Sequence, residues 1–263
     1  MSTFKLNRRA FLTKASLGAS ALTLAGCDIL DGLNERDATA RNFVEGANTL
    51  TYRAQRLLGG GHTLAPEYTI ADLKQSQHPN GITAPEDEDY LALAAKDFAG
   101  YTFKVKGLVE KPLELTREQL MAMPSRTQIT RHDCVEGWSC IAKWTGVPLG
   151  KILDQAKPKL EARFVVFHCF DTIENGLGGA IKYYESIDMI DAYHPQTILA
   201  YGLNDKPLPV PNGAPLRVRI ERQLGYKMAK YVHTVELVSK FTDIGEGNGG
   251  YWEDRGYDWY AGI

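Results

Sequence analysis

The sequence predicts an α+β fold with mixed sheets and short helices, and two observations support this. Segments in which apolar and polar residues alternate, as in half-buried strands, are interspersed with short segments that carry helix start and stop signals. The two kinds of segment follow no regular period, whereas a doubly wound protein alternates strands and helices regularly. The chain has 263 residues, of which 44% are hydrophobic and 24% charged, which is enough for one substantial core.

The first predicted elements are a strand, a short helix and an extended segment. Over 101–106, aromatic and branched residues alternate with threonine and lysine, which predicts a strand with one buried face. Thr116 is followed three positions later by Gln119, the capping-box pattern that starts a helix, and Pro124 ends that helix. Residues 125–135 are then expected to be extended.

The second half of the chain is expected to be rich in strands. Pro148 suits the first turn of a helix that ends at Ala156, because its ring fixes a helical φ. A second helix is expected over 186–192 and is ended by Pro195. The remaining predicted elements are strands over 163–169, 197–203, 216–220 and 231–238, with a tight turn at Asn204 and Asp205.

The first 27 residues are expected to be a targeting segment and not part of the fold. Arg8 and Arg9 precede Ala-Phe-Leu and a short apolar stretch, the pattern of a twin-arginine signal that exports a folded protein to the periplasm. Leu24 to Cys27 resembles a bacterial lipobox, in which Cys27 would carry a lipid. Asp28 resembles the signal that retains lipoproteins on the outer leaflet of the inner membrane. The alternatives are an ordinary leader with a chance arginine pair, and cleavage without lipidation.

Three regions are expected: the signal at 1–27, a loop-rich segment at 28–95 with one helix over 36–55, and a domain at 96–263. A net charge of −2 and an isoelectric point near 6.3 give no reason to expect nucleic acid as a partner. Beyond the signal, no stretch is apolar over the roughly 20 residues needed to cross a bilayer.

Three cysteines, Cys134, Cys140 and Cys169, follow the signal, and an odd number leaves at least one outside internal disulfides. Cys140 and Cys169 either pair or are buried as small hydrophobic residues. A zinc site built from Cys134, Cys140, His132 and His168 is disfavoured, because the two cysteines are further apart than the usual two to four residues.

The strongest functional signal is the run from Arg131 to Trp138, with Cys134 at its centre. A thiolate is a soft donor suited to molybdenum, and a nearby cation such as Arg131 favours a low thiol pKa. By composition alone, a single cysteine is more often a buried hydrophobic residue. The pattern Cys-Val-Glu-x-Trp, with arginine three residues before it and Trp144 to Leu149 after it, resembles the sulfite-oxidase-like molybdopterin-dependent oxidoreductases.

This resemblance implies a sulfite-oxidase-type molybdopterin-binding domain without a C-terminal immunoglobulin-like domain, acting as a monomer. It also implies a molybdenum–molybdopterin cofactor, with Cys134 as the metal ligand and as a catalytic residue. Glu136 and Arg131 are the other catalytic candidates, although Glu136 could equally be a solvated or salt-bridged glutamate. The chain resembles the small exported members of the family, which are related to the periplasmic methionine-sulfoxide-reducing catalytic subunit.

Four further residues are cofactor-binding candidates by the same resemblance. Asn212 and Arg217 belong to an Asn-Gly-Ala-Pro-Leu-Arg element that contacts the pterin and its phosphate in the family, and a guanidinium suits phosphate. Thr172 follows Phe-Asp as in the sulfoxide-reducing branch, and Asn80 stands where the family has an asparagine near the cofactor. The alternatives are an exposed strand arginine at 217, a turn-capping threonine at 172 and a turn residue at 80.

The segment Gly-Tyr-Lys-Met-Ala-Lys resembles the family element that holds the pterin through backbone amides and lysine. Successive backbone N–H groups can converge on an anion in such a turn. The candidates are therefore Lys227, Met228, Ala229 and Lys230, although the family usually has serine at 228. Residues 250–260 include five aromatic residues. A core-sealing tail is the default interpretation of these residues, and a lining of the approach to the metal is the alternative.

The predicted function is a periplasmic molybdenum oxidoreductase that transfers an oxygen atom, in a two-electron reaction, at a small sulfur or nitrogen centre. The direction stays open, because Arg131 and His132 are the only nearby cations for sulfite, while the Tyr-Glu pair of the sulfoxide-reducing branch is missing after Asn80. The sequence contains no Cys-x-x-Cys-His heme motif. Electrons are therefore expected to pass through a separate electron-transfer protein or a membrane heme or quinone partner. The alternative function is a lipid-anchored periplasmic binding module in which Cys134 is structural.

Overall fold

The computed structural model describes residues 39–59, 62–73, 77–176 and 179–263. The chain divides into two compact units, 1–54 and 55–263. The signal and lipid-anchor predictions lie outside the described residues. The helix expected over 36–55 is observed as α3 (Thr39–Gly59). None of the described helices combines the length and the apolar character that a membrane span requires.

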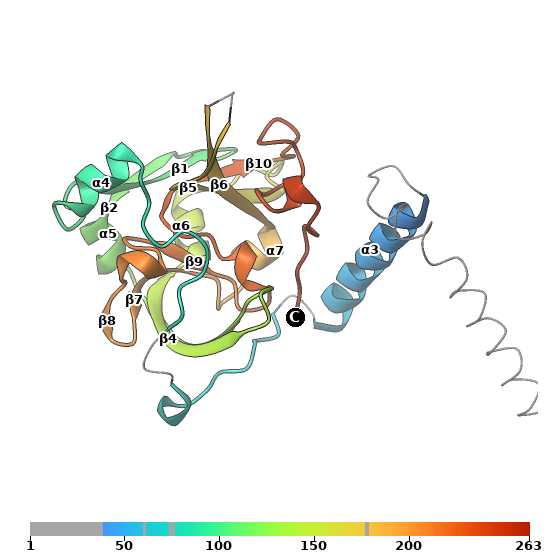
Figure 1. Cartoon of the computed structure of the whole chain (residues 1–263), viewed down its shortest axis with the longest axis horizontal. Helices are drawn as coiled ribbons and strands as arrows, with labels where there is room; N and C mark the ends of the chain where they lie inside the picture. Colours follow the sequence, from blue (N-terminus) through green and yellow to red (C-terminus); the bar gives the residue numbers. More distant parts are fainter. Residues whose placement is uncertain (1–38, 60–61, 74–76, 177–178) are drawn as a thin grey trace, which may run out of the picture. The chain divides into compact units, whose positions relative to one another are not determined.

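The first sheet contains β1 (Thr102–Gly107), β2 (Leu113–Thr116), β5 (Phe164–Gly176), β6 (Gly179–Asp188) and β10 (Val232–Val238). Their order is β2-β1-β10-β5-β6 (Figure 1), with β1 and β10 parallel and the other neighbours antiparallel. The predicted alternation is confirmed in β1, where Phe103 and Val105 are buried while Lys104 is exposed.

The second sheet contains β3 (Arg126–Asp133), β4 (Ser139–Pro148), β7 (Ile198–Leu203), β8 (Lys206–Pro207) and β9 (Arg217–Arg219). β4 pairs with β3 and β7, and β7 also pairs with β8 and β9, always antiparallel. Asn204 and Asp205 join β7 to β8 with φ angles of 50° and 62°, which confirms the predicted tight turn. The extended segment predicted over 125–135 is observed as β3, and Cys134 directly follows it.

Four short helices accompany the sheets: α4 (Glu88–Ala94), α5 (Arg117–Ala122), α6 (Leu149–Ala156) and α7 (Met189–Ala192). The capping box of α5 is confirmed, because the Thr116 hydroxyl accepts from the Gln119 amide at 3.2 Å and the Gln119 side chain accepts from the Thr116 amide at 2.8 Å. The helix predicted over 186–192 is wrong in its first half. Residues 186–188 belong to β6 and pair with β5, so α7 begins only after them.

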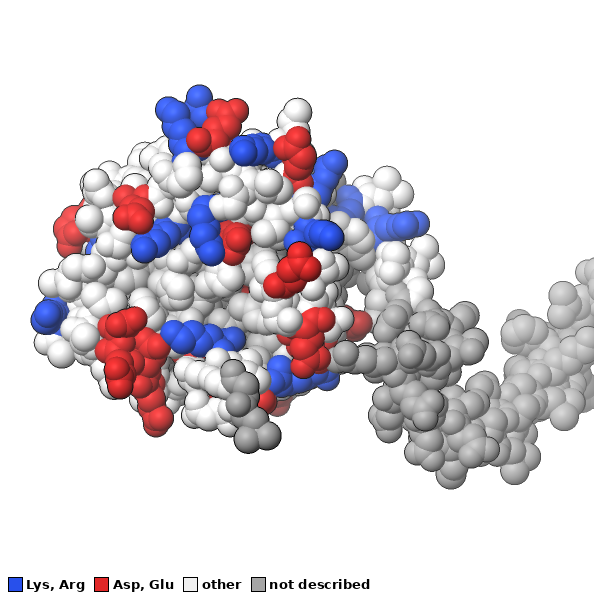
Figure 2. Space-filling view, turned by 90° about the horizontal axis from the view of Figure 1, so that it is seen from above, with Lys and Arg blue, Asp and Glu red and all other residues white. Residues whose placement is uncertain are grey.

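The main hydrophobic core joins the two sheets. Phe103 of β1, Phe167 of β5, Leu153 of α6 and Val218 of β9 belong to one buried cluster. The observed mixture of strands and short helices confirms the predicted α+β class. On the surface shown in Figure 2, residues of the two charge signs are interspersed, and neither sign gathers in one large patch.

Candidate active site

Cys134 lies in the turn that joins β3 to β4. Its amide donates to the carbonyl of Trp138 at 3.0 Å, and its carbonyl accepts from the amide of Gly137 at 3.0 Å. Gly137 has a φ of +86°, a conformation that favours glycine. Cys134 is partly buried and borders a cavity of about 250 Å³, so its thiol is not enclosed in packed hydrocarbon.

Five other parts of the chain form the rest of this cavity, which we call the Cys134 cavity. They are the loop 80–82, strands β5 and β6, the segment that begins with the 3₁₀ turn η3 (Gly225–Lys227), and the C-terminal tail after residue 250. The apolar and aromatic lining residues are Ile82, Val135, Ile173, Tyr183, Tyr226, Met228, Trp252 and Tyr257. Of the residues predicted from the sequence, the structure brings together here Asn80, Cys134, Glu136, Met228 and Lys230.

Lys230 fastens the loop 80–82 to the cavity wall. Its Nζ donates to the carbonyl of Asn80 at 2.6 Å, to that of Pro211 at 3.0 Å and to that of Ile82. Burial, with a contribution from the Arg217 charge, lowers the pKa of Lys230 to about 7. The ammonium is therefore poorly neutralised, and an anion placed beside it would stabilise its charged form.

Asp171 is a lining residue that sequence reasoning missed. Its carboxylate is buried, its Oδ1 has no hydrogen-bond partner among the described residues, and burial raises its pKa to about 7. The predicted residue, Thr172, does not line the cavity. Successive residues of a strand point to opposite faces, so the neighbours Asp171 and Ile173 line the cavity instead.

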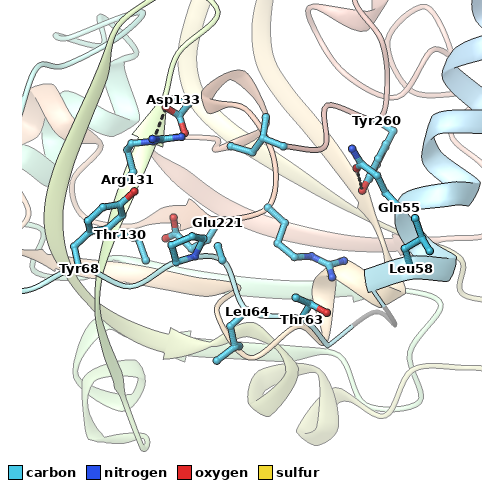
Figure 3. Close-up of a pocket in the computed structure, with 14 residues that line it drawn as sticks. Gln55, Leu58, Thr63, Leu64, Tyr68, Thr130, Arg131, Asp133, Glu221 and Tyr260 are labelled. Atoms are coloured by element: carbon cyan, nitrogen blue, oxygen red, sulfur yellow. Dashed lines mark hydrogen bonds and ion pairs between the residues drawn. The ribbon is translucent and has the colours of Figure 1, made fainter.

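Arg131 does not border the Cys134 cavity. Its Nε lies 2.9 Å from a carboxylate oxygen of Asp133, and both residues line a second cavity of about 510 Å³ with Tyr68 and Glu221 (Figure 3). Burial, together with the charge of nearby Glu136, raises the pKa of the Cys134 thiol. The pKa lowering expected from Arg131 is therefore absent in this structure.

Glu136 is exposed and borders the Cys134 cavity. Its carboxylate accepts a hydrogen bond from Nε1 of Trp138 at 2.7 Å, and Trp138 in turn packs edge-on against His78 with ring centroids 4.8 Å apart. The glutamate is thus held at the rim of the cavity by the hairpin turn that carries the thiol. This position is compatible with either of the two roles considered for it.

Asn212 and Arg217 lie behind the wall of the cavity and do not line it. Arg217 is buried, and its guanidinium donates to the carbonyls of Asn212 at 2.9 Å and Met228 at 3.4 Å while lying 5.0 Å from the Trp144 ring centre. Its Nε has no partner among the residues that the structure describes. Burial and the neighbouring Arg219 lower its pKa to about 9. The exposed strand arginine considered as an alternative is therefore not observed.

Lys227 and Ala229 also do not border the cavity. The Lys227 ammonium is completely buried and bonds the carboxylates of Glu185 and Glu253, which raise its pKa against the effect of burial. The amides of Lys227 and Met228 donate at 3.0 and 3.1 Å to carbonyls of the 3₁₀ turn. The turn therefore does not present these two amides as the anion-binding nest expected from the sequence.

The remaining cysteines lie on different sheets. Cys140 is buried on β4, and Cys169 is buried on β5 with a free thiol, so the two do not pair. Among the residues that the structure describes, no three His, Cys, Asp or Glu side chains converge as a metal site.

The residues around Cys134 fit the cofactor implied by the resemblance. Cys134 offers a soft sulfur donor, and a metal-bound thiol is deprotonated whatever its metal-free pKa. Lys230 and Arg217 are buried cations with lowered pKa values, which an anionic group would stabilise. His132 has an unpartnered Nε2 within the described part of the chain, and a Cβ at Gly225 would lie 2.5 Å from it. Nε2 of His132 thus faces the backbone of Gly225, which has no side chain, in the cavity wall.

Comparison with known proteins identifies the family. Residues 90–243 match the model of the oxidoreductase molybdopterin binding domain. A protein of Azospira oryzae named "Putative protein-methionine-sulfoxide reductase subunit YedZ1" is 35% identical over 256 residues, covering 97% of this chain and 87% of that protein. The protein-methionine-sulfoxide reductase catalytic subunit MsrP of Xanthomonas axonopodis pv. citri is 38% identical over 149 residues.

The match to MsrP covers 54% of this chain and 46% of MsrP, so it spans less than half the length of that relative. Among solved structures, the sulfane dehydrogenase SoxCD from Paracoccus pantotrophus aligns with a TM-score of 0.48 and 24% identity, covering 53% of this chain and 38% of that chain. The family match extends over more than half of the chain and contains Cys134 and Arg217. This protein belongs to the family of oxidoreductases with a molybdopterin-binding domain, and its sulfite-oxidase-type fold and enzymatic nature follow from that membership.

Proposed function

We propose that this enzyme reduces sulfoxides by two-electron oxygen-atom transfer, with a molybdenum–molybdopterin cofactor bound through Cys134. One observation carries the choice of substrate: the Cys134 cavity is lined mainly by apolar and aromatic side chains. Lys230 is the one cation among the described lining residues of this cavity, and two acidic residues, Glu136 and Asp171, line the same cavity. A neutral sulfoxide suits such a lining better than the sulfite dianion, which needs compensating charge.

The reaction balances without any further reactant except an electron donor. A sulfoxide, two electrons and two protons become a thioether and a water molecule, with the S–O bond broken. The bound cofactor supplies the oxygen-atom and electron chemistry. The chain supplies the Cys134 thiolate and one of the two protons, while the second proton comes from solvent. The buried cations Arg217 and Lys230 would stabilise anionic parts of the cofactor. Asp171 suits the role of proton donor, because its pKa of about 7 lets it hold a proton at neutral pH.

The names of the relatives support this choice, since both YedZ1 and MsrP are named for protein-methionine-sulfoxide reductases. Family membership favours an enzyme over the binding module in which Cys134 would be structural. Sulfite oxidation is the second candidate. It is disfavoured because Arg131 pairs with Asp133 at another cavity, and because burial and neighbouring cations keep the pKa of His132 well below its usual value.

The test uses protein produced with active molybdenum-cofactor synthesis. We expect about one molybdenum per chain, reduction of methionine sulfoxide with a reduced dye as donor, and little sulfite oxidation with a dye acceptor. Cys134→Ser should lose the metal, whereas Asp171→Asn should keep it and lose turnover by about 100-fold. Faster oxidation of sulfite than reduction of any sulfoxide by the wild type would contradict the proposal.

We further propose that the chain is exported through its twin-arginine signal to the periplasm, with Cys27 lipidated on the outer leaflet of the inner membrane. The supporting pattern is Arg8-Arg9 followed by the lipobox that ends at Cys27. Arg8→Lys combined with Arg9→Lys should leave the protein in the cytoplasm, as fractionation would show. Mass spectrometry of mature protein with no acyl chain on Cys27 would contradict the lipid anchor.

We also propose domain boundaries at residues 27 and 95. We propose in addition that the enzyme exchanges electrons with a partner, which is a separate electron-transfer protein or a membrane heme or quinone partner. The boundary at 95 is supported by the family match, which begins at residue 90. The partner is supported by the lack of a Cys-x-x-Cys-His heme motif. Isolation of the exported holoprotein in complex with a redox protein tests the second proposal. Recovery of the exported holoprotein with no redox protein bound, together with no reduction by membranes or by soluble quinol, would contradict it.

A further inference from the structure

We propose that Trp252 and Tyr257 of the C-terminal tail form the substrate-selecting wall of the Cys134 cavity. The ligand we assign to this wall is an uncharged organosulfur group with a bulky apolar substituent. The inference rests on the proposed sulfoxide reduction and extends it to the substituents that the enzyme accepts.

Both aromatic rings line the same cavity as the Cys134 thiol. Trp252 is half-buried, whereas Tyr257 is 41% exposed and therefore stands at the mouth of the cavity. Their ring centres are 5.2 Å apart, and Tyr257 also packs edge-on against Tyr226, with ring centres 5.3 Å apart. The three rings thus form one continuous aromatic surface that leads from solvent toward the thiol.

This surface is held in place by buried charge. Glu253, directly after Trp252, bonds the Lys227 ammonium together with Glu185, and all three side chains are buried. A side chain at Gly250 would collide with this cluster, because its Cβ would lie 2.0 Å from a Glu253 carboxylate oxygen. The tail can therefore approach the cluster closely only with glycine at this position.

Two further contacts fix the outer part of the tail. Arg255 forms an ion pair with Glu174 of β5 at 2.9 Å and lies 3.6 Å from the ring centre of Tyr251. The hydroxyl of Tyr226 donates to the carbonyl of Asp258 at 2.6 Å. The tail (red in Figure 1) follows β10 in the sequence and is anchored on both sides of Tyr257. A wall fixed in this way selects by shape, since its rings need not be ordered when a ligand binds.

The chemistry of the wall favours a sulfur group with an alkyl or aryl substituent. Sulfur and methyl groups make favourable contacts with aromatic rings. The negative face of an aromatic ring repels an anion, so a charged oxyanion would not be stabilised by the same surface. We therefore expect the enzyme to discriminate by the size of the apolar substituent, with Trp252 and Tyr257 as the residues that set this preference.

The experiment measures the binding of two sulfones, which resemble sulfoxides, to molybdenum-loaded protein by calorimetry. We expect methyl phenyl sulfone to bind wild-type protein more tightly than dimethyl sulfone. Trp252→Ala and Tyr257→Ala should each weaken the binding of the phenyl compound by about 10-fold, while that of dimethyl sulfone changes by less than about 3-fold. The molybdenum content of both variants should equal that of the wild type.

Trp259→Phe is the matched control, since Trp259 belongs to the same tail but stacks on Phe241 and contacts Phe164. It should change thermal stability without changing either affinity. Unchanged binding of the phenyl sulfone in Tyr257→Ala, whose half-exposed side chain can be removed without unfolding the protein, would overturn the inference.

Turnover is measured separately with methyl phenyl sulfoxide and dimethyl sulfoxide. Failure of the wild type to reduce either compound would refute the proposed function, while the sulfone affinities would still decide whether the aromatic wall binds its ligand. Reduction of both compounds with the same preference in wild type and both alanine variants would refute the wall and leave the proposed function intact.

Discussion

Arg219 donates a hydrogen bond from Nη1 to Nδ1 of His132 at 2.8 Å, and both side chains are buried. Arginine has no acceptor atom, so Nδ1 of His132 is the acceptor and its ring proton lies on Nε2. Arg219 is held in turn by two hydrogen bonds to the carboxylate of Glu221, at 2.7 and 3.0 Å. The Glu221–Arg219–His132 chain therefore orients one N–H donor toward Gly225 in the wall of the Cys134 cavity.

This arrangement predicts that Gly225→Ala is harmful. The new Cβ would lie 2.5 Å from Nε2 of His132, and neither the buried ring nor the backbone can retreat easily. We expect a loss of about 1–3 kcal/mol in the free energy of unfolding, together with lower molybdenum content. Gly46→Ala is the control, since a Cβ there meets no atom within 4 Å. Equal thermal stability of the Gly225 variant and wild type would contradict the geometry.

Arg217→Ala is expected to weaken both the fold and cofactor retention. The guanidinium bonds two backbone carbonyls and covers the Trp144 ring, so its removal leaves buried acceptors without a donor. Each such group costs about 1–3 kcal/mol.

Cys134→Ser should instead lose molybdenum with a stability change below about 1 kcal/mol, because Cys134 is only partly buried. Denaturant unfolding and elemental analysis of both variants separate the two effects, and wild-type stability in the Arg217 variant would show that its hydrogen bonds contribute little.

Asp191 is the centre of a buried charge network. It accepts from Arg56 at 2.8 and 2.7 Å and from Arg222 at 2.9 Å. Burial alone would raise its pKa, but the two arginines lower it below the usual value. Asp191→Asn removes the carboxylate that Arg222 pairs with, while Arg56 keeps its ion pair with Asp188 at 2.9 Å. We expect the substitution to cost about 3 kcal/mol in urea unfolding. Glu236 is a quarter exposed and contacts Lys106 at 3.1 Å and His168 at 2.9 Å. Glu236→Gln should cost no more than about 1 kcal/mol, and a similar cost for both variants would be inconsistent with the role of Asp191.

His233 should make stability depend on pH. Burial, followed by the nearby His168 and Lys182 charges, lowers its pKa to about 4, although Asp87 has a small opposite effect. Between pH 6.5 and 4 the unfolded chain binds a proton at this residue while the folded protein does not, so stability falls as the pH falls through this range. The contribution is at most about 3 kcal/mol. His233→Gln should flatten the curve of unfolding free energy against pH, and a curve parallel to that of wild type would exclude this role.

Local pattern predicted several elements well. The alternation around Phe103 and Val105 predicted β1, and the Thr116–Gln119 pair predicted the start of α5. In both cases the signal lies within a few neighbouring residues and depends little on the rest of the chain. Strand β6 was missed, because it begins in a hairpin with exposed residues and ends among buried polar ones, so it shows no simple alternation.

The candidate site was only partly predictable for a similar reason. The sequence singled out Cys134, Asn80 and Lys230, which the structure places at one cavity. It pointed to Thr172, but register shifts in β5 on either side of this residue decide which side chains reach the cavity, and these depend on pairing with β6. When a strand contains such irregularities, its own sequence does not show which side of the sheet each side chain points to.

The environments of the buried charged residues could not be predicted from the sequence either. Lys227 and Lys230 lie three positions apart in the sequence, yet one ammonium is enclosed by Glu185 and Glu253 and the other holds the loop 80–82. Nothing local distinguishes the two lysines, because each environment is supplied by distant segments. The two glutamates would likewise be read as solvated residues, although both are buried.

By itself, the sequence determined the α+β class, the short-range elements and the family-like segment around Cys134, because these depend on neighbouring residues. Only the tertiary structure decided that Asp171, Trp252 and Tyr257 line the cavity and that Arg131 and Arg217 do not. The physical reason is that a cavity is formed by segments far apart in the chain, and their side-chain directions are set by strand pairing and by buried ion pairs.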